Sequence, residues 1–469
     1  MKHQSEFFNK EVKGINMTRT VRGRLGRSIV AAATTLVLGI SLAACSSESP
    51  ADNAGGGNAA EGEAALEKAL EEGGELTYWS WTPSGQDQVD AFMKEYPNVK
   101  VNLVNAGTNT EEYTKLQNTL KAGTGAPDVV QIEYYAIPQF ALSGGLVDLT
   151  QYGFSSLKDD YAPGPWSGVT VGDAVYGLPQ DSGPMALFYN KELFDKHDIE
   201  VPSTWDEYIA AAKKLNDADP TKFITTDTGD AGMTTSMIWQ AGGRPFSVDG
   251  TSATINLADE GTKKYTDMWQ QLIDQDLLAD IPGWTDEWYK GLGDGTIASL
   301  ISGAWMPGVL QGSVSDGNGK WAVAPIPTYD GQPVTSENGG GAQAVTSQSK
   351  NPALAAAFLK WLNNSETSID VFLASGGFPA TTADLNSDEF KNQESEYFGG
   401  QKINEVLSAA SASVSTGWQY LPYQVYGISI FGDSVSGAYT GNGTLQEGLT
   451  AWQDQLVTYG NSQGFSVNK

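Results

Sequence analysis

The order of predicted strands and helices between residues 76 and 145 restricts this chain to one class of fold. Residues 76–81 and 99–103 alternate between apolar and polar side chains, as strands do, and residues 127–132 form a third, buried strand. Two segments in which apolar side chains recur at helical spacing separate these strands. A β-α-β-α-β order requires a parallel sheet with helices on both faces. The sequence therefore predicts an α/β domain whose ligand binds beyond the carboxyl ends of the strands.

A second informative segment, residues 175–215, joins a short extended run to a strand and then to a helix. A polar turn at residues 180–184 separates the extended run from the apolar strand of residues 185–189. Thr204 and Glu207 have the spacing of a capping box, in which the two side chains satisfy free amides of the first helical turn. Such a succession is typical of a chain that crosses from one α/β lobe into another.

This segment resembles the extracellular solute-binding proteins of bacterial ABC importers, in the sugar-binding branch related to maltose-binding protein. The residues that carry the resemblance are Tyr176-Gly177-Leu178-Pro179, Asp181, Leu187-Phe188-Tyr189-Asn190-Lys191, Leu193-Phe194 and Val201-Pro202-Ser203-Thr204-Trp205-Asp206-Glu207. The resemblance extends from about Glu75 to the C-terminus. It implies a periplasmic-binding-protein-like fold of type II, in which three hinge crossings join two α/β lobes and a ligand cleft lies between them.

The resemblance also divides the chain into segments. We expect residues 74–181 to form the first part of lobe 1 and residues 182–329 the first part of lobe 2. Residues 330–377 would then return to lobe 1, and residues 378–469 would add C-terminal helices to lobe 2.

Residues 1–44 are predicted to be a secretory signal. Four arginines precede an apolar run at residues 29–42, which is shorter than the roughly 20 residues of a spanning helix. Cys45, the only cysteine, stands where a bacterial lipobox places the residue that is lipidated after cleavage; an uncleaved signal anchor is the alternative. Residues 45–73 are predicted to be a flexible tether, because the segment 46–63 lacks aromatic and branched apolar side chains. The protein would then be lipid-anchored at the extracellular face of the cytoplasmic membrane.

Charge limits the ligands that the chain can bind. Its net charge is −28, and after residue 44 it contains one arginine, Arg244, and one histidine, His197. This balance repels nucleic acid and anionic lipid, and the scarcity of arginine disfavours phosphate and carboxylate ligands. A single histidine excludes His-rich metal sites and leaves a Ser-His-Asp triad dependent on His197. No phosphate-binding loop motif is present. We therefore expect no cofactor, no metal, no nucleic-acid partner and no catalytic residues.

Aromatic side chains give the strongest indication of a ligand, because the chain has 13 Trp and 19 Tyr. Sugars stack their C–H faces on aromatic rings, while their hydroxyls need fixed polar partners. The candidate ligand-binding residues lie in loops, at strand ends or at the expected crossings, and they are Trp79, Trp81, Glu133, Tyr134, Asp181, Trp284, Trp305, Gly340, Phe378 and Trp418. The tryptophans expected to pack in the core are Trp205, Trp269, Trp321, Trp361 and Trp452. Trp239 and Trp288 stay open between the two roles.

The resemblance implies roles for two of the candidates. Trp305 ends a segment similar to the family motif Gly-x-x-Ala-Met-x-x-x-Gly-x-Trp, although Ser299-Leu300 stands where Ala-Met is usual. In the family this tryptophan begins a short helix and stacks on sugar. Asp181 lies in the crossing turn, where the related sugar binders place a carboxylate that binds hydroxyl groups.

Together these features predict a monomeric carrier that captures a neutral di- to tetrasaccharide and delivers it to the membrane permease of an ABC transporter. Three alternatives remain open at this point. The chain could bind another polar solute, such as a polyol or a glycerol phosphodiester. It could be a surface glycoside hydrolase, because so many acidic residues always offer pairs of carboxylates. It could also be an adhesin that holds polymeric glycan.

Overall fold

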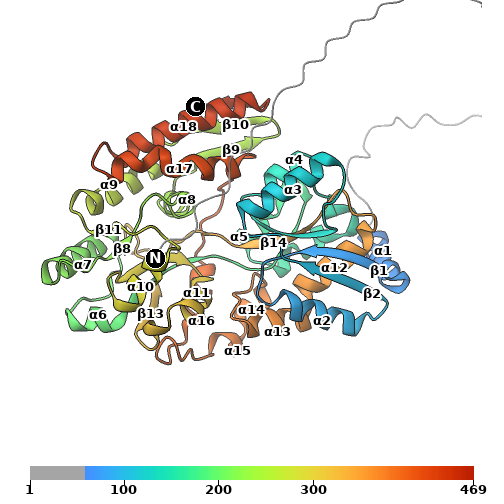
Figure 1. The fold of residues 1–469 in the computed structure, drawn as a ribbon, viewed down its shortest axis with the longest axis horizontal. Coiled ribbons are helices and arrows are strands. Elements are labelled where there is room, and N and C mark those ends of the chain that lie inside the picture. Colours follow the sequence, from blue (N-terminus) through green and yellow to red (C-terminus); the bar gives the residue numbers. More distant parts are fainter. Residues whose placement is uncertain (1–58) are drawn as a thin grey trace, which may run out of the picture. The chain divides into compact units, whose positions relative to one another are not determined.

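The computed structural model describes residues 59–469. The predicted signal, Cys45 and the tether up to residue 58 lie outside the described residues. Within the described part, two larger sheets with their helices make up most of the fold (Figure 1).

The first sheet has five strands in the order β2-β1-β3-β14-β6. They are β1 (Gly74–Trp79), β2 (Val99–Val104), β3 (Val129–Glu133), β6 (Leu178–Pro179) and β14 (Gly341–Val345). β1, β2 and β3 are parallel, which confirms the β-α-β-α-β prediction. Two strands from outside this segment complete the sheet in the other direction, since β14 runs antiparallel to β3 and β6 antiparallel to β14. β6 is the last strand before the chain enters the second sheet, and β14 is the first strand after the chain returns from it.

Helices cover both faces of this sheet, as the element order predicts. Figure 1 shows α3 (Thr110–Ala122) and α4 (Ile137–Leu142) on one side, and α2 (Gly85–Glu95) and α12 (Pro352–Asn364) on the other. The core between them is apolar and tightly packed. For example, the Phe92 and Phe358 rings meet edge to face at 4.8 Å between centroids.

The second sheet is antiparallel, in the order β12-β7-β13. Its strands are β7 (Met185–Asn190), β12 (Ser299–Gly303) and β13 (Trp321–Pro325). The central strand β7 is buried throughout, which explains its apolar sequence. Among the helices around this sheet are α7 (Trp205–Ala218), α9 (Glu260–Asp274) and α11 (Met306–Ser313).

The predicted capping box at Thr204 is confirmed, and a second one is present at Thr444. At the start of α7, the Glu207 amide donates to Thr204 Oγ1 (3.3 Å), and the Thr204 amide donates to the Glu207 carboxylate (3.1 Å). Thr444 and Glu447 form the same pair at the start of α18 (Leu445–Ser462). The five tryptophans expected to pack in the core are all buried.

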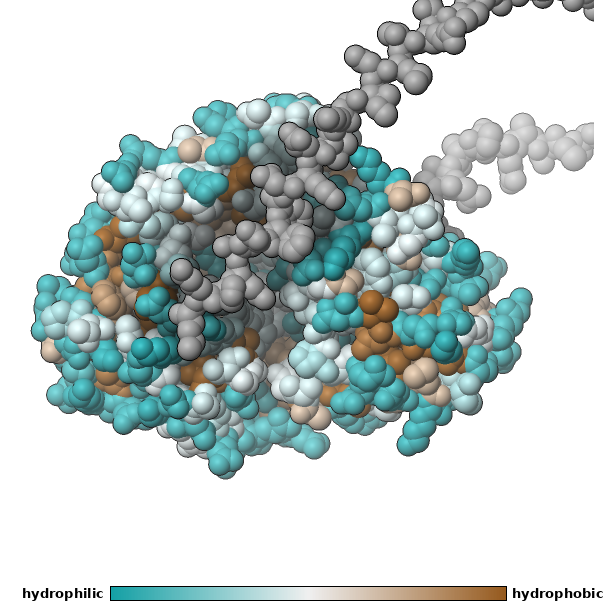
Figure 2. Space-filling model, viewed as in Figure 1, coloured by the Kyte–Doolittle hydropathy of each residue, from teal (hydrophilic) through white to brown (hydrophobic). Residues whose placement is uncertain are grey.

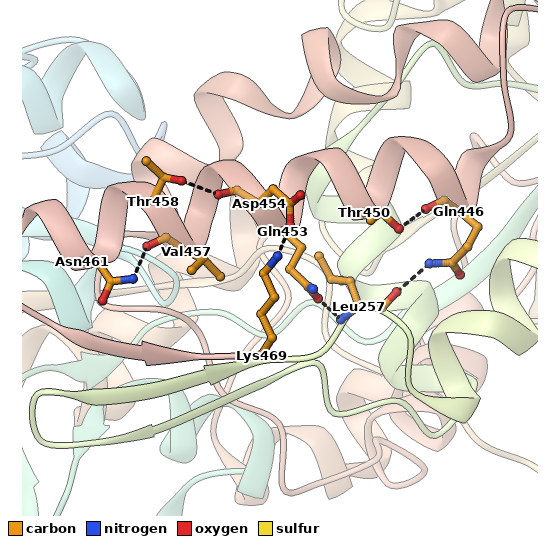
Figure 3. A network of polar contacts seen from close by, with 9 residues as sticks. All are labelled: Leu257, Gln446, Thr450, Gln453, Asp454, Val457, Thr458, Asn461 and Lys469. Atoms are coloured by element: carbon orange, nitrogen blue, oxygen red, sulfur yellow. Dashed lines mark hydrogen bonds and ion pairs between the residues drawn. The ribbon is translucent and has the colours of Figure 1, made fainter.

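The C-terminal segment differs from the prediction of helices alone. After α17 (Gln424–Tyr439) and α18, the chain ends in β15 (Ser466–Asn468), which pairs with β10 (Ser252–Ile255) beside β9 (Phe246–Asp249). Figure 3 shows how α18 is fixed: Gln446 and Gln453 bond the backbone of Leu257, and Lys469 pairs with Asp454 at 2.5 Å. A three-residue strand is too short to show a period in sequence.

The remaining elements are short or lie at the edges of the two sheets. They are α1 (Ala59–Glu72), α5 (Pro163–Gly168), α6 (Lys191–Lys196), α8 (Ala231–Gln240), α10 (Asp286–Asp294), α13 (Glu366–Ala374), α14 (Thr382–Asn386), α15 (Asp388–Lys391), α16 (Ile403–Ser411), η1 (Leu149–Tyr152), η2 (Phe154–Asp160), η3 (Ser315–Gly317), β4 (Thr170–Val171), β5 (Ala174–Val175), β8 (Thr225–Thr226) and β11 (Leu278–Ala279).

Helix α1 corrects the predicted tether. Residues 59–72 are helical and pack against α12 and η1, with Leu66 only 3% exposed. The reason is visible in the sequence, since Ala, Glu, Leu and Lys favour helices and Leu66, Ala69 and Leu70 fall on one face.

Three segments connect the two sheets, and they lie side by side. Residues 180–184 join β6 to β7, residues 326–340 join β13 to β14, and residues 375–381 leave α13. Backbone bridges link Asp181 to Pro379 and Pro184 to Glu337. The structure thus has two α/β lobes and three crossings between them.

Hydrophilic side chains cover most of the face seen in Figure 2, and apolar side chains appear on it in small separate areas. Within residues 59–469, the large apolar side chains that are exposed are Val104, Leu142, Val201 and Trp284. None of the helices in this part of the chain has both the length and the apolar character needed to cross a membrane.

Candidate functional site

A cavity of about 950 Å³ lies where the carboxyl end of β3 faces β12 of the second sheet. The crossings also contribute to its lining, through Asp181 and the glycines at residues 339–341. Its volume is at the upper end of the range for small-molecule sites. The position agrees with the rule that ligands of α/β sheets bind beyond the strands' carboxyl ends.

The structure brings most of the predicted site residues together. Those that line the cavity are Trp81, Glu133, Asp181, Trp284, Trp305, Gly340 and Phe378. Trp239 and Trp288, which the sequence left open, also line it. The lining residues that the sequence did not single out include Gln131, Gln180, Asp227, Asp230, Asn338 and Tyr420. Tyr135, which the sequence places with Glu133 and Tyr134 at the end of a predicted strand, also lines the cavity.

The structure places Trp79, Tyr134 and Trp418 outside this lining. Trp79 packs against the core of the first lobe. The buried Tyr134 ring fills the space beside Gly340, and its hydroxyl donates to the Asp181 carbonyl at 2.6 Å. Trp418 is 6% exposed and lies behind Trp239. Tyr134 and Trp418 therefore support residues that do line the cavity.

One side of the cavity, which we name the polar wall, consists of Gln131, Glu133, Tyr135, Gln180 and Asp181. Gln131 Oε1 accepts hydrogen bonds from Ser80 Oγ (2.6 Å) and from the Trp81 amide (3.0 Å). These bonds fix the turn after β1 and thereby the backbone position of Trp81. Glu133 Oε2 accepts from the Tyr113 hydroxyl at 3.2 Å.

The two carboxyl groups of the polar wall have raised pKa values. Burial raises the pKa of Glu133 to about 7, and the neighbouring Asp181 carboxylate acts in the same direction. Burial also raises the pKa of Asp181 to about 6, although Asp181 Oδ1 accepts a 2.5 Å hydrogen bond from the Gly341 amide. Near neutral pH the Glu133 carboxyl can therefore accept a hydrogen bond from a ligand hydroxyl or donate one to it.

The opposite side of the cavity, the aromatic wall, consists of Trp284, Trp288 and Trp305. The Trp284 ring stacks on Trp305 with centroids 5.7 Å apart and an interplanar angle of 28°, and it meets Trp288 at 5.1 Å. Trp305 immediately precedes α11, as predicted, and its Nε1 donates to the Asn338 carbonyl at 2.7 Å. This bond ties the wall to a crossing segment.

Trp239 and Tyr420 close the cavity between the two walls. Trp418 stacks behind Trp239, with centroids 4.3 Å apart and an angle of 14°. The Arg244 guanidinium donates to the Trp239 carbonyl (3.1 Å) and to the Thr416 carbonyl (2.6 Å). The guanidinium therefore joins the end of α8 to the segment that presents Tyr420.

Among residues 59–469, the charged side chains that line the cavity are all acidic: Glu133, Asp181, Asp227 and Asp230. Burial raises the pKa of Asp227 to about 6, while its carboxylate accepts from Trp269 Nε1 at 2.9 Å and from the Tyr439 hydroxyl. A cavity without a cationic side chain disfavours anionic ligands. The described residues include no group of three or more His, Cys, Asp or Glu arranged to hold a metal ion.

Two buried side-chain N–H groups of the lining residues have no hydrogen-bond partner within the described chain. They are Gln180 Nε2 and Trp239 Nε1. Buried donors without a partner are costly. Both nitrogen atoms are themselves inaccessible in this structure, so they do not form part of the surface that a ligand would touch.

Comparison with known proteins gives one matching family. The model of a family described as bacterial extracellular solute-binding protein matches residues 78–368. An arabinooligosaccharide-binding protein of Halalkalibacterium halodurans is 26% identical over 351 residues, which cover 70% of this chain and 76% of that protein. A lactose-binding protein of Rhizobium radiobacter is 25% identical and covers 70% of this chain and 80% of its own length.

Two solved structures of transporter-associated binding proteins are also similar. One, from B. animalis subsp. lactis Bl-04 in complex with β-1,6-galactobiose, is 46% identical with a TM-score of 0.77, and the match covers 84% of this chain and 99% of that one. The other, from Bifidobacterium longum in complex with lacto-N-biose, is 30% identical with a TM-score of 0.75, and the match covers 85% and 99%. In both cases the likeness extends over both lobes of the present chain.

Proposed function

Because this chain belongs to the bacterial extracellular solute-binding proteins, we propose that it captures a neutral oligosaccharide in the cavity and delivers it to the membrane permease of an ABC importer. The observation that carries the proposal is the composition of the cavity. It places tryptophan rings opposite carboxyl and amide groups, and within the described residues it has no cationic side chain. Sugars need this combination of apolar faces and hydroxyl partners.

Trp305 is the main stacking residue in this proposal. Its hydrogen bond to the Asn338 carbonyl and its contact with Trp284 hold the ring in one orientation. A ring that is already fixed loses little side-chain entropy when a sugar stacks on it.

The hydroxyl groups of the sugar would bind to the polar wall. Glu133 and Asp181 offer acceptors, and the side-chain amide nitrogen of Gln131 would offer a donor. Each ligand hydroxyl both donates and accepts, so a wall with both kinds of group suits it. Discrimination between sugars would follow from which hydroxyls find a partner.

The crossings would act as the hinge. Asp181 from the first crossing accepts from Gly341 at the end of the second, and Glu337 from the second accepts from the Gly183 amide of the first at 2.7 Å. This reciprocal pair of bonds would make the two segments move together. A ligand that touches both walls would then stabilise the closed form by its contacts with both lobes.

We also propose that the lobe boundaries are those implied by the family resemblance. One lobe would comprise residues 74–181 and 330–377, and the other residues 182–329 and 378–469. The packing of α12 against β14 in the first sheet and of α16 against β13 in the second supports this division.

Outside the cavity, the proposal includes a monomer anchored through lipidated Cys45 at the extracellular face of the membrane, with no catalytic activity. The disaccharides to test first are those bound by the two similar structures, β-1,6-galactobiose and lacto-N-biose. Other polar solutes are the second candidate. The acidic lining disfavours a phosphodiester among them and leaves a polyol.

The test is a thermal-shift screen of the chain without its first 45 residues against di-, tri- and tetrasaccharides and polyols. A ligand at 100 times its dissociation constant should add about 2.7 kcal/mol to the free energy of unfolding. We expect one group of oligosaccharides to raise the melting temperature and to be recovered intact by chromatography. A shift with polyols alone would contradict the proposal, and shortened saccharides would indicate a glycoside hydrolase. Binding restricted to polymeric glycan would indicate an adhesin.

A further inference from the structure

Trp284 has an unusual position for a residue of its size. Its side chain is 53% exposed, yet it lines the cavity together with Pro282 and Gly283. The other exposed large apolar residues of the described chain, Val104, Leu142 and Val201, do not line the cavity. An apolar surface that is exposed at the entrance of a binding site marks a place where a ligand can pack.

The backbone of Trp284 is also unusual. Its φ of 67° lies in the left-handed region, where a bulky residue is strained. Local bonds maintain the turn, because Thr285 Oγ1 donates to the Pro282 carbonyl at 2.8 Å and also caps α10. Strained residues of this kind gather at ligand sites. Here the conformation turns the ring onto Trp305 and Trp288.

Exposure rises along the aromatic wall. Trp288 is 3% exposed, Trp305 is half-buried, and Trp284 is more than half exposed. The Trp284 ring contacts both of the others, so the three rings form one apolar cluster that is buried at Trp288 and exposed at Trp284. A sugar unit that stacks on Trp305 leaves the outer ring available to the next unit of the same chain.

Resting on the proposed function, we propose that Trp284 determines the length of the oligosaccharide, by stacking on a third sugar unit beyond the two that Trp305 and the polar wall enclose. The chain would then bind trisaccharides and longer saccharides more tightly than disaccharides with the same linkage. The removal of this ring would abolish the difference while the inner site keeps its contacts.

The experiment measures dissociation constants by calorimetry for a disaccharide, a trisaccharide and a tetrasaccharide of the series that the wild-type protein binds best. The variants are Trp284→Ala, which removes the ring, Trp284→Gly, which also relieves the backbone strain, and Trp284→Phe, which keeps an aromatic surface. Leu142→Ala is the matched control, because Leu142 is exposed (43%) but does not line the cavity.

We expect Trp284→Ala and Trp284→Gly to weaken binding of the tri- and tetrasaccharide about tenfold and binding of the disaccharide less than about threefold. Trp284→Phe should restore most of the preference for longer chains, and Leu142→Ala should change nothing. An equal loss for every length would overturn the proposal. Tighter disaccharide binding by Trp284→Ala would also overturn it, because the ring would then cover Trp305 instead of extending the site.

The proposed function and this inference fail in different ways. If the wild-type protein binds no saccharide of any length, the proposed function fails and the inference falls with it. If it binds saccharides but prefers none of the three lengths, the assignment of Trp284 alone is wrong.

Discussion

The polar wall and the aromatic wall face the same cavity but are built by different means. Hydrogen bonds hold the polar wall, as in the contacts of Gln131 with the turn after β1 and of Asp181 with Gly341. Ring contacts hold the aromatic wall, and only Trp305 among its members is fixed by a hydrogen bond to a crossing. A hydrogen bond restricts the direction in which a ligand group can bind, whereas a stacked ring accepts a ligand in several positions along its face.

This difference suggests that the two walls contribute to binding in different ways. The polar wall would select the pattern of hydroxyl groups, and the aromatic wall would supply affinity and set chain length. A ligand would gain both only when both lobes contact it. The following predictions test this division, from the largest expected effect to the smallest.

Removal of the Trp305 ring from the aromatic wall should have the largest effect. We expect Trp305→Ala to weaken oligosaccharide binding by about 2 kcal/mol, or about 30-fold, because central aromatic contacts dominate binding energy. Trp305→Phe, which keeps a ring but loses the bond to Asn338, should lie between this variant and the wild type. Calorimetry measures both. Unchanged affinity in Trp305→Ala would show that the aromatic wall does not contribute.

A change in the polar wall should have a smaller effect, and one that depends on pH. If a ligand hydroxyl donates to the ionised Glu133 carboxylate, whose pKa is about 7, affinity should rise up to about tenfold between pH 6 and pH 8. Asp181, with a pKa of about 6, acts in the same direction. Glu133→Gln should bind about three- to tenfold more weakly at pH 8 and should lose most of the pH dependence. A variant that keeps the full pH dependence would assign it to another group.

Behind the polar wall, the buried carboxyl group of Glu112 should affect stability more than binding. Glu112 is fully buried, neither of its oxygens has a partner within the described residues, and burial raises its pKa to about 8. Since the unfolded state releases this proton at a lower pH, the folded state binds it more tightly. Its contribution is therefore greatest below about pH 4.5 and is lost as the pH rises to about 8.

We therefore expect Glu112→Gln, which mimics the protonated form, to melt about 2–4 °C above the wild type at pH 8 and to match it near pH 5. Thermal melts across this pH range measure the difference. A variant that is less stable at both values would show that the carboxylate has a partner in solution.

The smallest effect is expected at a place remote from both walls. Thr204→Ala removes the capping box of α7 and should cost about 1 kcal/mol of stability. Neither Thr204 nor Glu207 lines the cavity, so oligosaccharide affinity should stay within about twofold of the wild type. A larger loss of affinity would mean that the lobe as a whole, and not its wall, controls binding.

The sequence predicted the features that depend on local spacing. The capping box at Thr204 follows from residues a few positions apart, and the parallel order of β1, β2 and β3 follows from the succession of strands and helices. The start of α11 after Trp305 was implied by the family resemblance. The sequence could not predict that β14 and β6 join this sheet as antiparallel strands, because the strands that they pair with lie far away in the chain. The helical segment 59–72 was missed although its spacing is local.

The site shows where such reasoning ends. In three places the sequence identified a segment that reaches the cavity, but not which of its side chains lines the cavity. Tyr135 lines the cavity while Tyr134 packs behind it, and Tyr420 lines it while Trp418 supports Trp239. Trp81 likewise faces the cavity and Trp79 the core.

By itself, then, the sequence determined the α/β class, the scarcity of arginine that disfavours anionic ligands, and the segments that reach the site. The tertiary structure decided which side chains face the cavity. The physical reason is that a segment's place follows from its own apolar spacing, whereas the direction of a loop side chain depends on distant contacts. The bond of Tyr134 to the Asp181 carbonyl and the pairing of Arg244 with the Thr416 carbonyl are such contacts, and they join residues 47 and 172 positions apart.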